Sequence, residues 1–163
     1  MHGLGYTTGV YKPFQTNAPA PIGGFTRIPD FEFFQNVDKF INLQATYLFQ
    51  DNVSAIVAAE EANSYIDKYV IKRDFEEFSN QQDCTIIDGN GGLLEPVAPS
   101  TMTKDIIQCL NIPLLFVITP DSENINNAIL SINTSINAGI EVRGVIINDY
   151  PTRELTLAEK SFP

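Results

Sequence analysis

The sequence predicts an α/β fold, built on a doubly wound, mainly parallel sheet that is flanked by helices. Two observations lead to this prediction. The second half of the chain alternates apolar segments with segments of helical spacing, and the segments at 113–118 and 142–147 are apolar at nearly every position. Strands that are apolar on both faces are typical of a parallel sheet that helices cover on its two sides.

The first half of the chain begins with a short strand and a long loop. Gly9–Lys12 is β-prone, and we expect Pro13 to end this strand because proline cannot donate to a ladder. The prolines and glycines of residues 17–29 predict a loop. Asp30 then precedes apolar residues at helical spacing as far as Ile41, and it suits the N-cap of a helix. Three aromatic residues of this helix are expected in the core: Phe31, Phe33 and Phe34.

The remaining elements alternate helices with strands. A short apolar strand at Thr85–Ile87 is stopped by the glycine-rich turn Asp88–Gly92. Gly139 is suited to end the last helix, because glycine adopts the left-handed conformation that follows many helices. Helices are predicted near residues 54–63, 70–80, 101–110 and 123–138, and further strands at 113–118 and 142–147.

The composition fits a globular chain. Its 163 residues are 44% apolar, which is ordinary for a protein with a core of its own. The net charge of −10 argues against a nucleic-acid surface, which needs clustered Lys and Arg. No apolar stretch is long enough to span a bilayer, and the N-terminus lacks the regions of a signal peptide. We therefore expect one cytoplasmic domain over residues 1–163, with no nucleic-acid or membrane partner.

Four segments with polar and glycine residues follow predicted strands. In sheets of this class, ligands bind at the carboxyl ends of the strands, where loops meet helix N-termini. All four segments leave strands of the predicted sheet, so we expect them to lie near one another. Together they indicate a ligand site more strongly than any one segment does. They are Tyr11–Thr16, Ile87–Gly92, Thr119–Ser122 and Ile147–Asp149.

These stretches resemble signature segments of one enzyme family. Gly9–Thr16 resembles the segment YKPV-x-[ST]-G of the dethiobiotin synthetases, which belong to the P-loop ATPase superfamily. Ile87–Pro96 resembles their VEGAGGLLVP segment, and Gly139–Asn148 is similar to their GL...GVVLN segment. The order and spacing of the motifs hold from about residue 9 to residue 149. The resemblance therefore covers most of the chain.

The resemblance implies a ligase of biotin biosynthesis that uses ATP and Mg²⁺. The family closes a ureido ring on 7,8-diaminopelargonate with CO2. A carbamate of the substrate attacks the γ-phosphate of ATP, and the resulting mixed anhydride cyclises. Such a reaction crowds negative charge, which a lysine, Mg²⁺ and backbone N–H groups can neutralise.

The resemblance also implies which residues form the site. Lys12 would be the catalytic residue, supplying a point positive charge to the carbamate and the phosphate. Thr16 would donate its hydroxyl to the substrate. Asp30 and Asp88 would hold Mg²⁺, since hard cations prefer oxygen ligands. Three residues complete the set: Gly91 and Gly92 would let the backbone approach the substrate, and Asn148 would pair with adenine through its amide.

Each of these residues also has a simpler interpretation. Lys12 can be a solvated lysine at the end of a strand. Asp30 can be an N-cap and no more. Asp88–Gly92 can be a flexible turn, and Asn148 can belong to a turn before Pro151.

The chain departs from the family in two respects. No segment has the form G-x-x-x-x-G-K-[ST], so the first strand and the phosphate-binding loop of a P-loop fold are missing from these residues. Asp88 stands where the family has glutamate, and its side chain is shorter by one C–C bond, about 1.5 Å. We therefore expect an incomplete domain, truncated at both ends, with weak activity on its own.

Three interpretations remain open. The first is an incomplete or mis-started dethiobiotin synthetase, which by resemblance would form a homodimer. The second is a loop-less pseudoenzyme that binds a small ligand or a partner. The third is another P-loop ATPase relative, of the cobyrinic-acid amidation type or a partitioning ATPase. The pairing of Tyr11–Pro13 with Asp88–Gly92 favours the first over the third.

Overall fold

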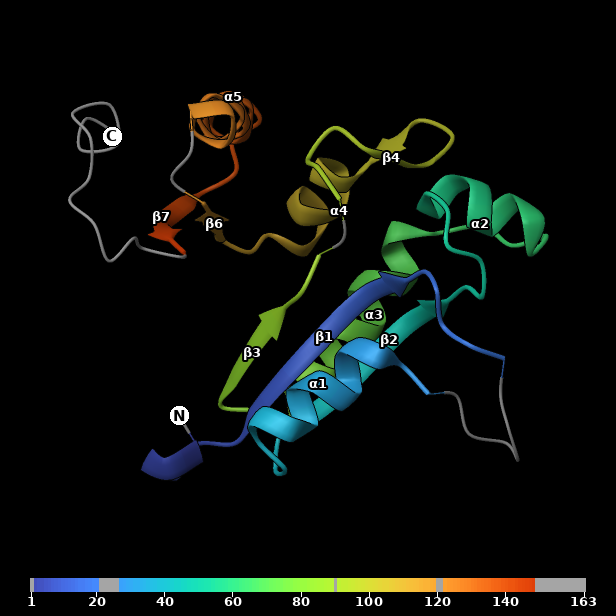
Figure 1. Ribbon diagram of the computed structural model, residues 1–163, viewed down its shortest axis with the longest axis vertical. Coiled ribbons are helices and arrows are strands. Elements are labelled where there is room, and N and C mark those ends of the chain that lie inside the picture. The colour runs from blue at the N-terminus through green and yellow to red at the C-terminus, as the bar shows by residue number, and fades with distance from the viewer. Residues whose placement is uncertain (1, 21–26, 90, 120–121, 149–163) are drawn as a thin grey trace. The chain divides into compact units, whose positions relative to one another are not determined.

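The computed structural model describes residues 2–20, 27–89, 91–119 and 122–148, and the chain divides into two compact units, Met1–Cys109 and Leu110–Pro163. The helices are η1 His2–Leu4, α1 Pro29–Val37, α2 Ala55–Glu61, α3 Lys68–Ser79, α4 Thr103–Leu110 and α5 Ser122–Asn137 (Figure 1). The strands are β1 Thr8–Gln15, β2 Asn42–Leu48, β3 Cys84–Ile87, β4 Pro96–Ala98, β5 Thr101–Met102, β6 Leu114–Ile118 and β7 Val142–Ile147. Parallel strands with flanking helices confirm the predicted α/β class.

A parallel three-stranded sheet in the order β2-β1-β3 forms the centre of the N-terminal unit (Figure 1). β1 pairs with β2 from Gly9 to Gln15 and with β3 from Thr8 to Tyr11. β1 therefore has a neighbour on each edge, and it is buried along almost its full length. Because the strands are parallel, the carboxyl ends of β1 and β3 lie at the same end of the sheet.

The two faces of β1 have different surroundings. The Tyr11 ring packs against Phe75 and Phe78 of α3, with centroids 5.5 and 6.1 Å away. Its hydroxyl donates a hydrogen bond to the Ile71 carbonyl at 3.0 Å. Lys12 reaches α1 instead, because successive side chains of a strand point to opposite faces. One face of the strand thus supports an aromatic core, and the other presents a lysine.

The first strand is longer than predicted, since β1 continues through Pro13 to Gln15. β3 pairs with β1 only as far as Tyr11, and the pairs with β2 fall at Lys12 and Phe14, on either side of the proline. The missing N–H of Pro13 therefore falls where the β3 side of the ladder has already ended. The expectation that Pro13 ends the strand is wrong for this reason.

Helix α1 begins before Asp30, so this residue is not an N-cap. Ile28 takes the N-cap position without a side-chain hydrogen bond, and Pro29 starts the helix. Proline suits this position because its missing N–H would have no partner inside the helix. Asp30 lies in the first turn, where a negative charge interacts favourably with the helix dipole. The N-cap interpretation is wrong, and the carboxylate is available for another role.

The aromatic residues of α1 do not all join the core. Phe31 and Phe34 are half-buried, whereas Phe33 is 65% exposed. Residues three apart share a face of a helix, so Phe31 and Phe34 point the same way while Phe33 points elsewhere. The core expectation is therefore wrong for Phe33, and it holds only in part for Phe31 and Phe34, because no residue of α1 is fully buried.

Two strand regions differ from the sequence expectation. The helix was expected to reach Ile41, but α1 ends at Val37 and residues 42–48 form β2, an element that the periodicity did not reveal. The helix expected at 101–110 begins at Thr103, because Thr101–Met102 pair antiparallel with β4. The Asp105 carboxylate accepts from the Met102 N–H at 2.7 Å, which satisfies a free donor at the start of α4.

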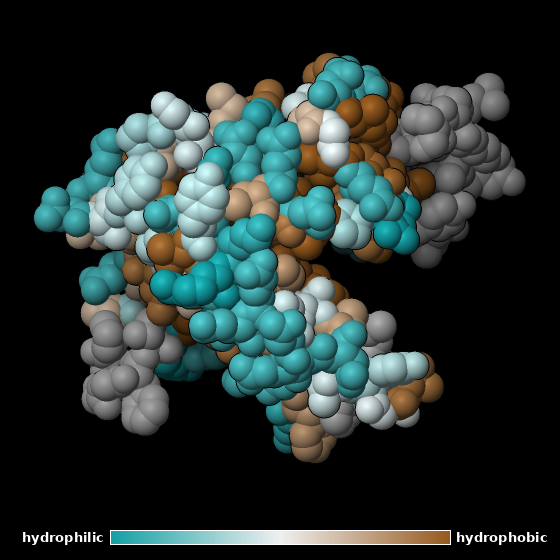
Figure 2. All heavy atoms as spheres, turned by 180° about the vertical axis from the view of Figure 1, so that it is seen from behind, coloured by the Kyte–Doolittle hydropathy of each residue, from teal (hydrophilic) through white to brown (hydrophobic). Residues whose placement is uncertain are grey.

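The C-terminal unit contains the parallel pair β6-β7, and α5 contacts both strands. Gly139 ends α5 as predicted, with a φ of 72° and its N–H donating to the Ile136 carbonyl at 2.9 Å. Leu115, Val117 and Ile146 share one face of the pair and are exposed. Figure 2 shows hydrophobic residues on the surface of this unit.

Some predicted features fall outside the described residues. These are Asn90, Pro120, Asp121 and Asp149 of the predicted ligand-binding segments, and residues 21–26 of the predicted loop. None of the described helices combines the length and the apolar character that crossing a bilayer requires.

Gly9 lies against the ring of Phe78, and a side chain at this position would collide with it. A Cβ on Gly9 would lie 2.7 Å from two ring carbons of Phe78, which is buried. We expect Gly9→Ala to lower the free energy of unfolding by about 1–3 kcal/mol, because the ring must leave its packed position. Urea unfolding followed by circular dichroism measures this change. Gly144→Ala is the matched control, since its Cβ would meet only Leu115 at 3.5 Å, and equal losses at both positions would contradict the prediction.

Tyr11 makes the stability depend on alkaline pH. Burial raises the pKa of the Tyr11 hydroxyl to about 12. The folded-state pKa lies above the unfolded value of about 10, so this contribution to stability is complete below pH 10 and is lost as the pH rises towards 12. We expect Tyr11→Phe to be less stable at neutral pH by about 1–3 kcal/mol, because the Ile71 carbonyl loses its buried donor.

Unfolding free energies measured at about pH 9 and about pH 11 test this sign. Tyr11→Phe should lose part of the alkaline decline, whereas Tyr65→Phe, at an exposed position, should keep all of it. A decline that is identical in the two variants would show that Tyr11 does not contribute to it.

Candidate functional site

Lys12 is a buried lysine on β1, the central strand of the sheet in the N-terminal unit. Its side chain is only 1% exposed, although lysine is rarely buried without a charged partner. β1 holds it in place, because the backbone of this strand is paired with β2 at Lys12 and with β3 up to the preceding residue. A solvated lysine at the end of a strand is therefore the wrong interpretation.

Two carboxylates from different parts of the sequence converge on the ammonium group of Lys12. Asp30 comes from the first turn of α1, and Asp88 directly follows β3. Each places its Oδ2 atom 2.7 Å from Lys12 Nζ. The Asp88 backbone is fixed as well, since its N–H donates to the Tyr11 carbonyl at 2.9 Å. The structure thus brings together three of the predicted site residues.

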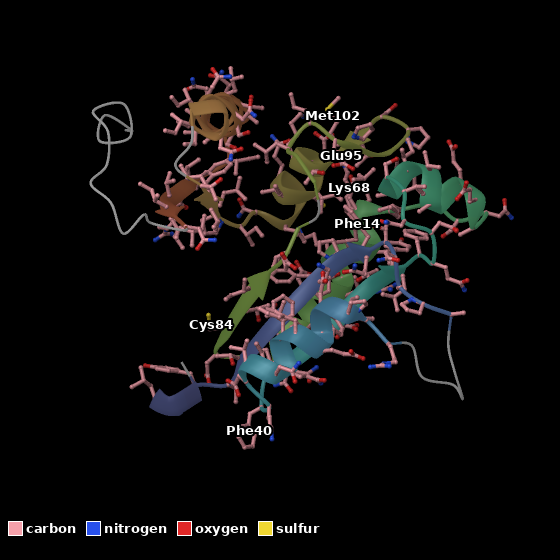
Figure 3. All side chains as sticks on the ribbon, in the orientation of Figure 1. Phe14, Phe40, Lys68, Cys84, Glu95 and Met102 are labelled. Carbon is pink, nitrogen blue, oxygen red and sulfur yellow. The ribbon has the colours of Figure 1, made fainter. Side chains whose placement is uncertain are left out.

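The cluster lies at the carboxyl end of the sheet, where ligands of α/β proteins bind. β1 and β3 run parallel, and Figure 3 labels Phe14 near the carboxyl end of β1 and Cys84 at the start of β3. The lysine is buried, but the Asp30 and Asp88 side chains are 40% and 39% exposed. Both carboxylates therefore connect a buried positive charge with the surface.

The charge of the cluster is not balanced within it. One ammonium and two carboxylates leave a net charge of −1. Each carboxylate uses Oδ2 on the lysine, and neither Oδ1 atom has a hydrogen-bond partner among the described residues. A divalent cation bound at these carboxylates would change the local charge from −1 to +1.

The two carboxylates fit what Mg²⁺ requires of a protein. This ion keeps several waters and binds through one or two carboxylates together with substrate phosphates, rather than in an all-protein cage. Within the described part of the chain, no group of three or more His, Cys, Asp or Glu side chains could hold a metal ion. A magnesium site here would therefore need ligand oxygens from outside these carboxylates.

Thr16 follows β1 and is half-buried. Its carbonyl accepts a hydrogen bond from Gln15 Nε2 at 2.7 Å. Gln15 Oε1 is buried and has no hydrogen-bond partner among the described residues. An unpaired acceptor in the interior is a place where a donor of a ligand or of water can bind. Nothing in the sequence singled out Gln15, because its neighbour Thr16 alone matched a motif.

The side chain of Glu95 lies against the two glycines, Gly91 and Gly92, that follow Asp88. Gly91 has a φ of +76°, which non-glycine residues rarely adopt. A Cβ on Gly91 would lie 1.6 Å from Glu95 Oε2, and the Gly92 N–H donates to the same oxygen at 3.2 Å. Glu95 is a second residue that sequence reasoning missed, since a glutamate after a turn carries no signal of its own.

Asn148 lies in the other unit, directly after β7. Its backbone N–H donates to the Ile118 carbonyl at 2.7 Å, which continues the ladder between β6 and β7. Its side chain is exposed. The predicted contact with adenine therefore stays a prediction.

Removing the lysine should destabilise the N-terminal unit. Lys12→Met keeps the length of the side chain but leaves Asp30 and Asp88 without their shared partner. We expect a loss of about 1–3 kcal/mol, below the 3–5 kcal/mol of a fully buried pair, because solvent screens the half-exposed carboxylates. Arg143→Met, which breaks an exposed pair with Glu141, is the control and should change stability by less than about 1 kcal/mol.

The triple variant Lys12→Met/Asp30→Asn/Asp88→Asn checks the cause. It should recover part of the loss seen in urea unfolding, because it removes the like-charge repulsion that the single substitution creates. If the triple variant is less stable than the single one, repulsion between the carboxylates is not the reason.

Comparison with known proteins places the chain in a family. A family model described as an AAA domain matches residues 1–161. The ATP-dependent dethiobiotin synthetase of Geobacillus sp. (strain WCH70) is 26% identical over 151 residues, which is 90% of this chain and 62% of that protein. ATP-dependent dethiobiotin synthetase BioD 2 of Haemophilus influenzae is 31% identical over 114 residues, which is 70% of this chain and 60% of that protein.

A third relative has higher identity over a shorter stretch. The ATP-dependent dethiobiotin synthetase of Methanococcus aeolicus is 40% identical over 97 residues, which is 59% of this chain and 46% of that protein. The chain thus spans less than two thirds of the length of each of these three relatives. With the parallel α/β fold and an almost complete match to the family model, the chain belongs to the AAA domain family, and its similarity within that family is to the dethiobiotin synthetases.

Proposed function

We propose that this chain carries the lysine and carboxylate part of the active site of an ATP-dependent dethiobiotin synthetase. The observation that supports this most is the contact of Lys12 with Asp30 and Asp88 at the carboxyl end of a parallel sheet. The similarity to dethiobiotin synthetases supports it independently. The proposed reaction closes a ureido ring on 7,8-diaminopelargonate with CO2 and ATP.

Lys12 is proposed to stabilise the charge that develops when the substrate carbamate attacks the γ-phosphate. A buried ammonium acts strongly on such charge, because little solvent screens it. Its present partners, Asp30 and Asp88, hold the ammonium at a fixed place. An anionic ligand would thus meet a lysine whose side chain is already oriented.

Asp30 and Asp88 are proposed to hold Mg²⁺ with the oxygens that do not contact the lysine. When bound, the ion would neutralise charge on the transferred phosphate. The half-exposed position of both carboxylates suits this role, since Mg²⁺ keeps waters and phosphate oxygens among its ligands. Asp88 would reach about 1.5 Å less far than the glutamate of the family motif.

The remaining residues are proposed to contact the organic ligands. Thr16 would donate its hydroxyl to the substrate, and Gln15 Oε1 offers a buried acceptor beside it. Gly91 and Gly92 would let the backbone come close to the substrate. Asn148 would pair with adenine through its amide. A homodimer is proposed from the family resemblance alone.

Binding measurements test this function directly. We would titrate the full 163-residue chain by calorimetry with MgCl2, with magnesium-ATP and with 7,8-diaminopelargonate. We expect Asp88→Asn and Asp30→Asn to weaken magnesium binding about 10-fold or more, because each removes one of two ligands. Lys12→Met should weaken binding of the anionic ligands by about 10- to 100-fold, since charge-assisted hydrogen bonds are lost.

Asp51→Asn is the matched control, because it removes the same charge at an exposed position outside the cluster. Circular dichroism of each variant shows whether it is folded under the conditions of the titration. Binding of magnesium and substrate without ATP would favour the ligand-binding pseudoenzyme instead. If folded Asp88→Asn and Asp51→Asn bind magnesium equally well, the carboxylates do not form the proposed site.

A further inference from the structure

The segment that follows Asp88 is anchored at several points. The Asp88 N–H is bound to the Tyr11 carbonyl, which fixes one end of the segment to β1. The Thr103 N–H donates to the Glu95 carbonyl at 3.0 Å, and the Lys104 N–H donates to the Leu93 carbonyl at 2.9 Å. The free donors at the start of α4 therefore hold the other end. The segment joins the magnesium ligand of the proposed site to a helix N-terminus.

Glu95 closes this segment on itself. Its backbone N–H donates to the Gly92 carbonyl at 3.0 Å, and its carboxylate returns to accept from the Gly92 N–H at 3.2 Å. The carboxylate also fills the space beside Gly91, where a Cβ would lie 1.6 Å from Oε2 and 3.2 Å from Oε1. One side chain thus satisfies a backbone donor and occupies the open side of the left-handed glycine.

We propose that Glu95 is a positioning residue, which holds the Gly91–Gly92 turn and thereby keeps Asp88 aligned with Lys12 and with bound magnesium. Gly91 is only three residues from Asp88, so a displaced turn can move the Asp88 carboxylate directly. The unusual φ of Gly91 needs a restraint, because glycine has more backbone freedom than any other residue. Glu95 provides that restraint from within the loop. The expected effect of Glu95 on magnesium binding rests on the proposed function. The contact between Glu95 and the two glycines does not depend on that function.

The test compares Glu95→Ala, Glu95→Gln and the control Glu60→Ala in the full chain. The Gly92 amide resonance in a proton–nitrogen NMR spectrum reports the contact directly. We expect Glu95→Ala to shift it and to weaken magnesium binding about 10-fold, as is typical when a residue that supports a metal ligand is removed. Glu95→Gln keeps an acceptor oxygen for the Gly92 N–H and should restore most of the affinity. Glu60→Ala, at an exposed helix position, should change neither quantity.

A second set of variants tests the packing without any ligand. Gly91→Ala should unfold at a lower temperature than Gly92→Ala, because nothing lies within 4 Å of a Cβ on Gly92. The double variant Gly91→Ala/Glu95→Ala should recover part of that loss, since the colliding carboxylate is gone. The strain of the positive φ should persist in the double variant.

The outcomes separate this role from the proposed function. If the wild-type chain does not bind magnesium, the proposed function fails, while the Gly92 shift and the recovery in the double variant still decide the contact. If wild type binds and Glu95→Ala binds equally well, the positioning role is overturned and the proposed function stands. An unchanged Gly92 resonance in Glu95→Ala, or no recovery in the double variant, would overturn the contact itself.

Discussion

The ammonium group of Lys12 lies inside the N-terminal unit, and a charge in that position must be paired. Two carboxylates meet this requirement at 2.7 Å each, and they come from separate elements. β3 must pair with β1 in parallel so that Asp88 emerges beside the lysine, and α1 must return to the opposite face of the strand from α3 so that Asp30 arrives. Much of the architecture of the unit follows from the place of this one charge.

β1 contributes to the core of this unit and also holds the lysine of the cluster. Tyr11 anchors the strand to α3 through ring packing and a hydrogen bond to the Ile71 carbonyl. Lys12, the next residue, points to the other face and donates hydrogen bonds to the carboxylates of Asp30 and Asp88. Because adjacent residues of a strand point in opposite directions, a rigid core on one face orients a charged group on the other.

In the loop after β3, Glu95 contacts two of the glycines, Gly91 and Gly92. Gly91 has a positive φ, which glycine adopts readily and other residues rarely adopt. Glu95 fills the space that a side chain on Gly91 would need. The start of α4 then holds the loop by donors that a helix leaves free. Asp88 itself is held to β1, because its N–H donates to the Tyr11 carbonyl.

The sequence by itself determined the α/β class, the parallel strands and the end of α5 at Gly139, because these depend on local periodicity and on backbone freedom. It also singled out Lys12, Asp30 and Asp88. It could not decide whether they bind a ligand or serve as a solvated lysine, a helix N-cap and part of a flexible turn. Contacts between residues far apart in the chain decided the rest. Pairing with β1 made β2 a strand and carried β1 past Pro13. Asp30 contacts Lys12 rather than capping a helix, since Pro29 starts α1. Glu95 became visible only when the turn was folded around it, because its partners are backbone atoms that no sequence pattern displays.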